Sequence, residues 1–228
     1  MAGKVRGSEK SGASVPPSDI GVWIERLETA HPDARLALDF SSPLELLVAL
    51  ILAAQCTDER VNEVTRTLFG KYRTASDYAE APQEVLEAEV KPTGFFRNKS
   101  KAIRACAGEL VERFGGKVPD RVEDLITLPG VGRKTANIVL GNAFGKPAIG
   151  VDTHVKRLAM RMGFTGESDP DRIEQDLVRI VPRPKWVRFC HLLQFHGRRI
   201  CVARNPKCPV CPVNDLCPKI GVSSAEGA

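Results

Sequence analysis

Four cysteines crowd into the C-terminal part of the chain at a spacing that is typical of a metal site. They follow the pattern Cys201-x6-Cys208-x2-Cys211-x5-Cys217, which places four possible thiolate ligands within seventeen residues. Three prolines interrupt the same run, so it cannot form a regular helix and is expected to fold as a compact loop around a metal. Four-cysteine zinc sites usually pair two short knuckles, whereas only one of these gaps is short. The spacing alone leaves a structural zinc ion and an iron–sulfur cluster as alternatives.

A glycine-bearing turn with the sequence L-P-G-V-G, residues 128–132, is a candidate phosphate-binding site. Glycine allows a tight turn and lets a phosphate approach backbone amides that a Cβ would shield. The amides of Gly130 and Gly132 are expected at the start of a helix, where the helix dipole reinforces an anion site. A turn of this kind is more often only a turn, but Arg133 and Lys134 follow it directly and helical patterns flank it. These features together predict a helix–hairpin–helix.

Two ionisable residues have positions that suit covalent and electrostatic catalysis. Lys134 is expected in the first turn of a helix beside Arg133, and both the positive helix end and the like charge favour its neutral, nucleophilic amine. The alternative is a lysine that only contacts phosphate or solvent. Asp152, in the sequence V-D-T-H, is predicted to cap the next helix. An ionised cap can also stabilise an oxocarbenium-like sugar or orient a water, so capping alone and capping with catalysis both stay open.

The hydrophobic pattern is helical almost throughout, and no segment alternates convincingly as a strand would. Ser42 and Pro43 supply an N-cap and a first-turn proline, with Glu45 as the capping-box partner. The predicted fold class is therefore all-α. Helices are expected from Ile20, after Ser42 to residue 54, around residues 61–68, 77 and 85, and over residues 103–114, 122–128, 133–140, 155–162, 170–180 and 186–195.

The composition is that of a globular protein with a mild basic bias. The 228 residues are 43% hydrophobic and 27% charged, which argues against a disordered or fibrous chain. The formal net charge is only +5, so the clustering of basic residues, rather than their number, must argue for a polyanionic partner. Together with the hairpin, the clusters predict one surface that follows a nucleic-acid backbone. The clustered residues are Arg97, Lys99, Lys101, Arg104, Arg133, Lys134, Lys156, Arg157, Arg161, Arg198, Arg199, Arg204 and Lys207.

No part of the sequence predicts secretion or insertion into a membrane. Residues 1–18 are rich in Gly, Ser, Lys and Pro and hold no apolar run, so they are expected to form a disordered tail. No later window reaches the roughly 18 unbroken apolar residues of a membrane span. Seven cysteines without a secretory signal argue against a disulfide framework, and Cys56, Cys106 and Cys190 are expected to be small buried hydrophobes. We therefore expect a cytoplasmic protein.

The combination of L-P-G-V-G-R-K-T-A, then V-D-T-H, then the four-cysteine run resembles the endonuclease III family of DNA glycosylases, within the helix–hairpin–helix superfamily. The match covers nearly all of residues 23–217. The resemblance implies an all-α helix–hairpin–helix glycosylase fold in two lobes, with the active site between them. A six-helix barrel would cover residues 36–146, and an iron–sulfur cluster lobe would cover residues 19–35 and 147–218. Residues 219–228 would form a flexible C-terminal tail.

The same resemblance assigns roles to individual residues. Lys134 would be the nucleophile on the anomeric sugar carbon and Asp152 the essential carboxylate, while the four cysteines would hold a 4Fe-4S cluster. A damaged base must be flipped out of the stack, and Gln55 and Phe95 match the residues that fill the resulting gap. An aliphatic residue is more usual at the second of these positions, where an aromatic ring could stack on the neighbouring base. The expected DNA contacts are Gln55, Phe95, Gly130, Val131, Gly132 and Arg133, and the expected cluster ligands are Cys201, Cys208, Cys211 and Cys217.

The implied function is base excision repair by a bifunctional DNA glycosylase that also cleaves abasic sites by β-elimination. Adenine-excising relatives lack a lysine at position 134 and carry a glutamate where this chain has Ala49, so the resemblance favours removal of oxidised pyrimidines. The expected partner is duplex DNA with damaged pyrimidines or abasic sites, bound by a monomer associated with the nucleoid. A mismatch-specific thymine or uracil glycosylase of the same fold is the alternative. A non-catalytic DNA-binding module would not need Lys134 and Asp152, and an electron-transfer protein would not need the hairpin.

Overall fold

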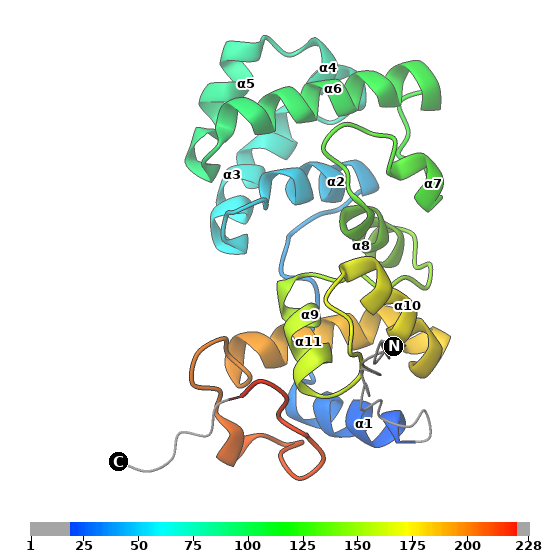
Figure 1. The fold of residues 1–228 in the computed structure, drawn as a ribbon. Helices are drawn as coiled ribbons and strands as arrows, with labels where there is room; N and C mark the ends of the chain where they lie inside the picture. Colours follow the sequence, from blue (N-terminus) through cyan, green and yellow to red (C-terminus); the bar gives the residue numbers. More distant parts are fainter. Residues whose placement is uncertain (1–18, 223–228) are drawn as a thin grey trace, which may run out of the picture. The chain divides into compact units, whose positions relative to one another are not determined.

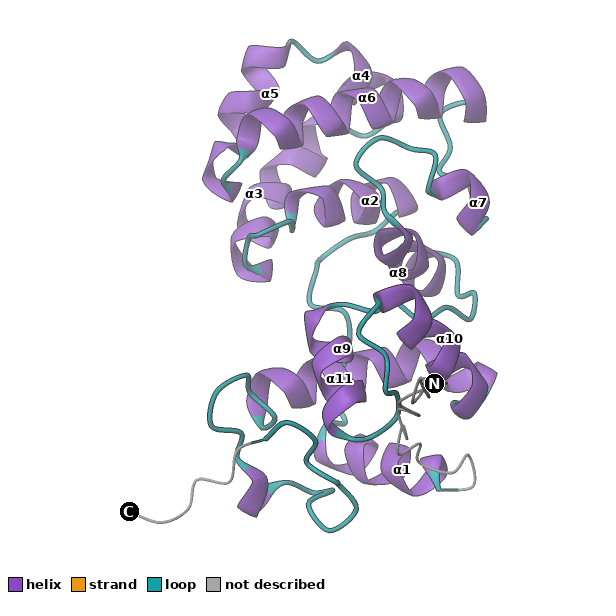
Figure 2. Cartoon of the chain, viewed as in Figure 1, coloured by secondary structure: helices purple, strands orange, loops and turns teal. Residues whose placement is uncertain are grey.

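The computed structural model describes residues 19–222, and all regular secondary structure in this range is helical (Figures 1 and 2). The predicted all-α class is therefore confirmed. The predicted N-terminal tail and residues 223–228 of the predicted C-terminal tail lie outside the described residues. The α-helices are α1 (Ile20–Ala30), α2 (Pro43–Leu52), α3 (Asp58–Lys71), α4 (Ala75–Glu80), α5 (Gln83–Val90), α6 (Phe96–Phe114), α7 (Val122–Leu125), α8 (Arg133–Ala143), α9 (Thr153–Arg161), α10 (Pro170–Ile180) and α11 (Trp186–Arg199). Three short 3-10 helices complete the set: η1 (Lys91–Thr93), η2 (Arg183–Lys185) and η3 (Cys208–Val210).

Several helices begin or end at other residues than their apolar patterns predict. α6 begins seven residues before the predicted start at residue 103, because the additional residues are mostly polar and so carry no apolar period. α7 ends at Leu125 rather than residue 128, and the chain continues as a turn in which Leu128 N donates to Leu125 O at 3.1 Å. α8 and α11 both continue one turn past their predicted ends. Within residues 19–222, no helix combines the length and the apolar character needed to span a bilayer.

Residues 36–150 form one compact unit, whose core includes most of α2. Six of the ten residues of α2 are buried, as its apolar sequence requires. Ser42 caps this helix as predicted, since its hydroxyl accepts a hydrogen bond of 3.2 Å from Glu45 N. The Glu45 carboxylate, however, accepts from the amide and hydroxyl of Ser41, at 2.6 and 2.7 Å, so the predicted capping box is displaced by one residue. In the same unit α6 packs along α4 and α5, and α8 packs against α2 (Figure 1).

Residues 19–35 and 151–222 form the second compact unit. Here α11 packs against both α1 and α9. The Trp23 ring meets Phe164 edge-on with 4.9 Å between centroids, and Phe164 lies 5.7 Å from Phe189, so three aromatic rings fill the centre of the unit. Gly197 allows α11 to approach α9 closely, because a Cβ at this position would stand 2.9 Å from His154 Nδ1. This packing fixes α9, the helix that Asp152 precedes.

Candidate functional site

The predicted hairpin joins α7 to α8 through residues 126–132. Gly130 has a φ of +78°, and a Cβ there would stand 3.1 Å from Ala102 Cβ on α6. Glycine is therefore required by the left-handed backbone and by the close packing. Gly132 is the N-cap residue of α8, and a Cβ added to it would meet nothing within 4 Å. Among the described residues no side chain caps α8, so its positive end keeps the character of an anion site.

The other two expected DNA contacts of this region, Val131 and Arg133, differ in how exposed their side chains are. Val131 is buried in the core of its unit and closes the turn, with its amide donating to Leu128 O at 3.1 Å. Any contact of Val131 with DNA must therefore use its backbone. Arg133 is the first residue of α8, and its side chain is exposed.

Lys134 is the second residue of α8, and its side chain is exposed. The helix is held at this end by the chain at residues 149–150. Asn137 Nδ2 donates to Ile149 O at 2.8 Å. A Cβ at Gly150 would stand 2.8 Å from Ile138 Cγ1 and 3.5 Å from Lys134 O. Glycine at position 150 thus lets the backbone pack directly on the lysine-bearing helix, a contact that the sequence pattern did not reveal.

Asp152 is the N-cap of α9, as predicted. Its Oδ1 accepts hydrogen bonds from the amides of His154, at 2.9 Å, and Val155, at 2.8 Å. Both bonds use the same oxygen, so the cap does not engage Oδ2. The residue is half-buried, and the two amides hold its carboxylate in one orientation. Asp152 and Lys134 belong to different compact units.

Gln55 and Phe95 share a backbone conformation that is rare for residues with a Cβ. Their φ angles are +53° and +47°. A left-handed conformation costs such residues about 1–2 kcal/mol, and strain of this kind clusters at functional sites. Both side chains are exposed, and 65% of the large apolar Phe95 is accessible. Gln55 lies in the turn between α2 and α3, and Phe95 is the N-cap of α6 in the same unit.

Lys99 was predicted to face DNA, and the structure shows that this prediction is wrong. Its side chain is only 4% exposed, and Nζ donates a hydrogen bond of 2.6 Å to Thr93 O. Burial lowers the pKa of Lys99, and the nearby Cys56 opposes that shift. The ammonium group therefore anchors the turn that leads into Phe95 instead of contacting phosphate.

Four other members of the predicted basic surface donate hydrogen bonds to groups of the protein. Arg104 donates to Gln83 Oε1 at 3.1 Å, and Arg199 makes two bonds of 2.9 and 2.6 Å to Asp33. Arg157 and Arg161 donate to backbone carbonyls of the C-terminal loop. Sequence alone did not show these partners. They engage the half-buried Arg104, Arg157 and Arg161, which leaves these residues less available to phosphate, whereas the Arg199–Asp33 pair lies at the surface. The residues of the predicted basic surface whose side chains are exposed, apart from Arg199, are Arg97, Lys101, Arg133, Lys134, Arg198, Arg204 and Lys207.

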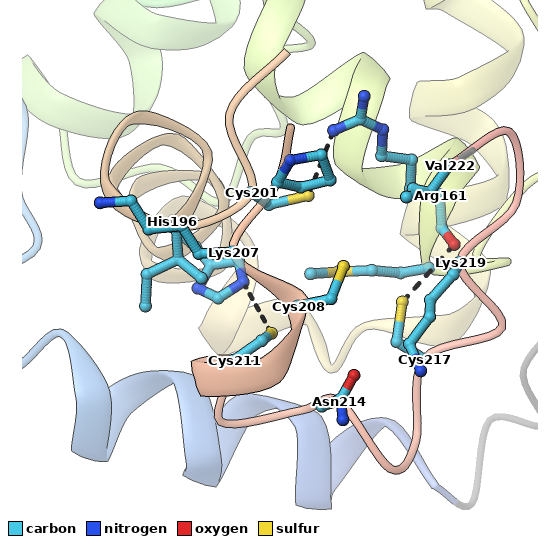
Figure 3. A pocket seen from close by; sticks show the side chains of 13 residues that line it. Arg161, His196, Cys201, Lys207, Cys208, Cys211, Asn214, Cys217, Lys219 and Val222 are labelled. Atoms are coloured by element: carbon cyan, nitrogen blue, oxygen red, sulfur yellow. Dashed lines mark hydrogen bonds between the residues drawn. The ribbon is translucent and has the colours of Figure 1, made fainter. Parts of the chain in front are cut away.

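The four C-terminal cysteines line one pocket (Figure 3). The chain between them is irregular apart from η3, as the prolines predicted. Arg161 on α9 fastens the start of this loop, donating to the carbonyls of Val202 and Ala203 at 2.8 Å each. Arg157, one turn earlier, donates to the carbonyls of Gly197 and Cys201 at 2.9 and 3.1 Å. The helix that Asp152 caps therefore also holds the cysteine loop.

Two of the sulfur atoms have nitrogen neighbours in Figure 3. Arg161 Nη1 donates to Cys201 Sγ at 3.5 Å, and His196 Nε2 lies 3.4 Å from Cys211 Sγ. Burial is the main cause that lowers the pKa of His196 to about 4, and burial also lowers the pKa of His31, its neighbour. His196 was not singled out by the sequence, although it lies only five residues before the first cysteine of the run.

The donor set fits an iron–sulfur cluster better than a zinc ion. Burial raises the pKa of the Cys211 and Cys217 thiols, so their ionised form needs a cationic partner in the cavity. Tetrahedral zinc draws four sulfurs to about 2.3 Å from one atom. A cluster instead takes each thiolate at a different iron, which suits four cysteines spread around a common cavity.

Comparison with protein families identifies two regions of the chain. Residues 48–183 match the HhH-GPD superfamily of base excision DNA repair proteins. Residues 201–217 match the iron–sulfur binding domain of endonuclease III. The first match contains the hairpin, Lys134 and Asp152, and the second begins and ends on the outer cysteines of the run.

Individual relatives extend the likeness over most of the chain. Endonuclease III of Synechocystis sp. is 50% identical over 198 residues, which are 86% of this chain and 90% of that protein. A solved structure described as a trapped endonuclease III–DNA covalent intermediate has a TM-score of 0.86 and 42% identity, covering 90% of this chain and 97% of that one. A thermostable thymine-DNA glycosylase has a TM-score of 0.81, with 89% and 96% coverage, but only 24% identity, so it shows the fold alone.

Proposed function

The chain belongs to the HhH-GPD superfamily of base excision DNA repair proteins, and within it to the endonuclease III family, and from this premise we propose that it excises oxidised pyrimidines from duplex DNA and then cleaves the strand. The observation that carries the proposal is Lys134 in the first turn of α8, exposed and directly after the hairpin. A relative with 42% identity was solved as a trapped covalent intermediate with DNA. Such an intermediate needs a nucleophile on the protein, and we assign this role to Lys134.

In the proposed reaction, Lys134 Nζ attacks the anomeric carbon of the damaged nucleotide. The glycosidic bond breaks, its electron pair leaves with the base, and the base takes up a proton. The Asp152 carboxylate stabilises the positive charge that develops on the sugar. Opening of the sugar ring gives a Schiff base between Nζ and the former anomeric carbon. Loss of a proton from the adjacent carbon then expels the 3′ phosphate by β-elimination, and water hydrolyses the Schiff base to free the lysine.

The same proposal gives the hairpin and the strained residues roles in holding the duplex. The amides of Gly130, Val131 and Gly132 would bind a backbone phosphate at the uncapped end of α8, with Arg133 adding positive charge. Gln55 and Phe95 would occupy the gap left by the extruded nucleotide. Exposure of both side chains supports this assignment, and the left-handed backbone at both positions is strain of the kind that clusters at functional sites. We propose that a monomer does this, in association with the nucleoid.

The iron–sulfur cluster of the endonuclease III domain is structural in this proposal. Cys201, Cys208, Cys211 and Cys217 would be its ligands and would cross-link the C-terminal chain. That chain buries little apolar surface of its own; between Val202 and Val222, Val213 is the one fully buried apolar side chain that the structure describes. Bound metal therefore replaces a hydrophobic core, and it takes no part in the chemical steps above.

A panel of duplexes, each with a single defined change, tests this function against its runner-up. The panel holds an oxidised pyrimidine, a thymine opposite guanine, a uracil opposite guanine, an abasic site and an undamaged control. We expect strand cleavage at the oxidised pyrimidine and at the abasic site. Preferential excision of mispaired thymine or uracil would overturn the proposed substrate class. Binding without any cleavage would reduce the protein to a DNA-binding module.

A further inference from the structure

Two buried histidines form a chain of contacts from the sulfur of Cys211 into the core of the second unit. His196 Nε2 lies 3.4 Å from Cys211 Sγ, and His196 Nδ1 lies 3.0 Å from His31 Nε2. His196 is fully buried and His31 is 2% exposed. The two rings meet edge-on with 5.3 Å between centroids. These residues are 165 positions apart in sequence, one just after α1 and the other on α11.

The proton positions along this chain of contacts follow from one chemical premise. A cysteine that binds iron is a thiolate and has no proton to donate, so His196 Nε2 must carry the proton between it and Cys211 Sγ. When the His196 ring carries this one proton, its Nδ1 is an acceptor, and the 3.0 Å contact then places the donor at His31 Nε2. The remaining nitrogen, His31 Nδ1, is buried and has no hydrogen-bond partner among the described residues. The bond to His196 is thus the only hydrogen bond that the His31 ring makes there.

We propose that His196 donates a hydrogen bond to the Cys211 ligand of the cluster, that His31 fixes the tautomer required for it, and that this pair raises the reduction potential of the cluster. The inference rests on the proposed assignment of Cys211 as a ligand. A hydrogen bond to a ligand sulfur stabilises the reduced, more negative cluster more than the oxidised one, so the potential rises.

The contacts of His196 indicate that its ring nitrogens bind the cysteine sulfur rather than stabilise the packing of the fold. Its ring bonds only to His31 and Cys211 among the described residues, whereas Arg161, the other nitrogen donor to a cysteine sulfur, also holds two loop carbonyls. An apolar side chain could fill the same buried volume without leaving two nitrogens to satisfy. Neither histidine has a step in the proposed glycosylase reaction.

Voltammetry of the intact protein on an electrode measures the effect directly. His196→Leu removes the donor, whereas His196→Gln keeps an N–H at the position of Nε2. We expect His196→Leu to shift the one-electron equilibrium toward the oxidised cluster by about tenfold, which is 59 mV for such a couple. His196→Gln should stay near the wild-type potential, and His31→Leu should shift it in the same direction as His196→Leu but less. His191→Leu, on the same helix and without a contact to the cysteines, is the matched control and should leave the potential unchanged.

Wild-type protein labelled with ¹⁵N-histidine provides a second test that needs no variant to fold. Magnetic resonance of the paramagnetic cluster should detect an exchangeable proton that is bound to histidine nitrogen and coupled to the cluster. Absence of that proton would overturn the inference. So would a His196→Leu protein that holds the cluster and keeps the wild-type potential. A wild-type protein without cluster absorption would instead refute the ligand assignment on which the inference rests, so the two failures are distinguishable.

Discussion

The Asp152 carboxylate accepts a hydrogen bond of 2.9 Å from the His154 amide and a second one, through the same oxygen, from the amide that follows. Asp169 caps α10 with the same pattern, accepting from two successive amides at 3.1 Å each. Residues 19–222 therefore contain two aspartates that cap a helix through their side chains with similar geometry. Only the first of them, Asp152, has a proposed role in chemistry.

This pair makes a matched test of Asp152. Asparagine caps helices about as well as aspartate, so Asp152→Asn and Asp169→Asn should each lower the free energy of unfolding by less than about 1 kcal/mol. Only Asp152→Asn removes the charge partner of the transition state, and excision should fall roughly 100- to 1,000-fold or more. Denaturant unfolding and single-turnover excision measure the two effects. Equal activity of the two variants would leave Asp152 as a cap and nothing more.

Phe95 offers a test of gap filling that depends on the form of the substrate. Phe95→Ala and Gln55→Ala should reduce excision from duplex DNA more than from single strands, because only the duplex has a gap to fill. Loss of a stacked aromatic ring is worth about 1–3 kcal/mol, which is roughly 5- to 150-fold for Phe95. Val85→Ala, another exposed apolar residue in the same unit, is the control and should affect neither substrate. Equal losses on duplex and single-stranded substrates would remove the assignment.

The two hairpin glycines should respond to alanine in opposite ways. Gly130→Ala places a Cβ in a left-handed backbone and 3.1 Å from Ala102, so we expect a stability loss of at least about 1–2 kcal/mol. Gly132→Ala has open space and an ordinary φ, so it should lose less than about 1 kcal/mol. Its Cβ would nevertheless shield the amides from phosphate and weaken binding to undamaged duplex. Binding titrations across a salt series, with thermal unfolding alongside, separate the two effects. Unchanged affinity of Gly132→Ala would argue against phosphate binding at this turn.

Local capping signals in the sequence predicted the starts of the helices that carry them. The predicted N-caps Ser42 and Asp152 are both present, because capping depends on residues two or three positions apart. The left-handed backbone at Phe95 had no comparable signal. The residue before it, Gly94, marks a turn but not the conformation of its neighbour.

Charged side chains were harder to place than helices. Sequence shows that Lys99 and Arg161 are charged, but not that one is buried beneath a turn and the other holds a loop more than 40 residues away. The same holds for Gly150, whose packing on α8 depends on a tertiary contact with Ile138. Charge patterns therefore predicted a nucleic-acid partner better than they predicted which residues would touch it.

The cysteine loop should depend on its metal for folding. Cys208→Ser is expected to lose both the visible absorption of the cluster and most of the folded protein, since few apolar contacts remain to hold the loop. Cys56→Ser, a half-buried cysteine in the other unit, should keep both. Absorption spectra, iron analysis and circular dichroism of the purified variants make the comparison. A colourless wild-type protein that contains zinc and is fully active would contradict the cluster.

Lys134 can be tested by capturing the intermediate that it is proposed to form. Borohydride reduces a Schiff base to a stable amine, so wild-type protein incubated with an oxidised-pyrimidine duplex should give a covalent protein–DNA adduct. Lys134→Gln should bind the same duplex with an affinity within about tenfold of wild type, because it removes only one of several positive charges that are expected near the phosphates. It should give no adduct and no strand break. Lys117→Gln removes an exposed lysine from the loop after α6 and should trap as well as wild type. An adduct that still formed with Lys134→Gln would place the nucleophile on another residue, and mass spectrometry of the digested adduct would identify it.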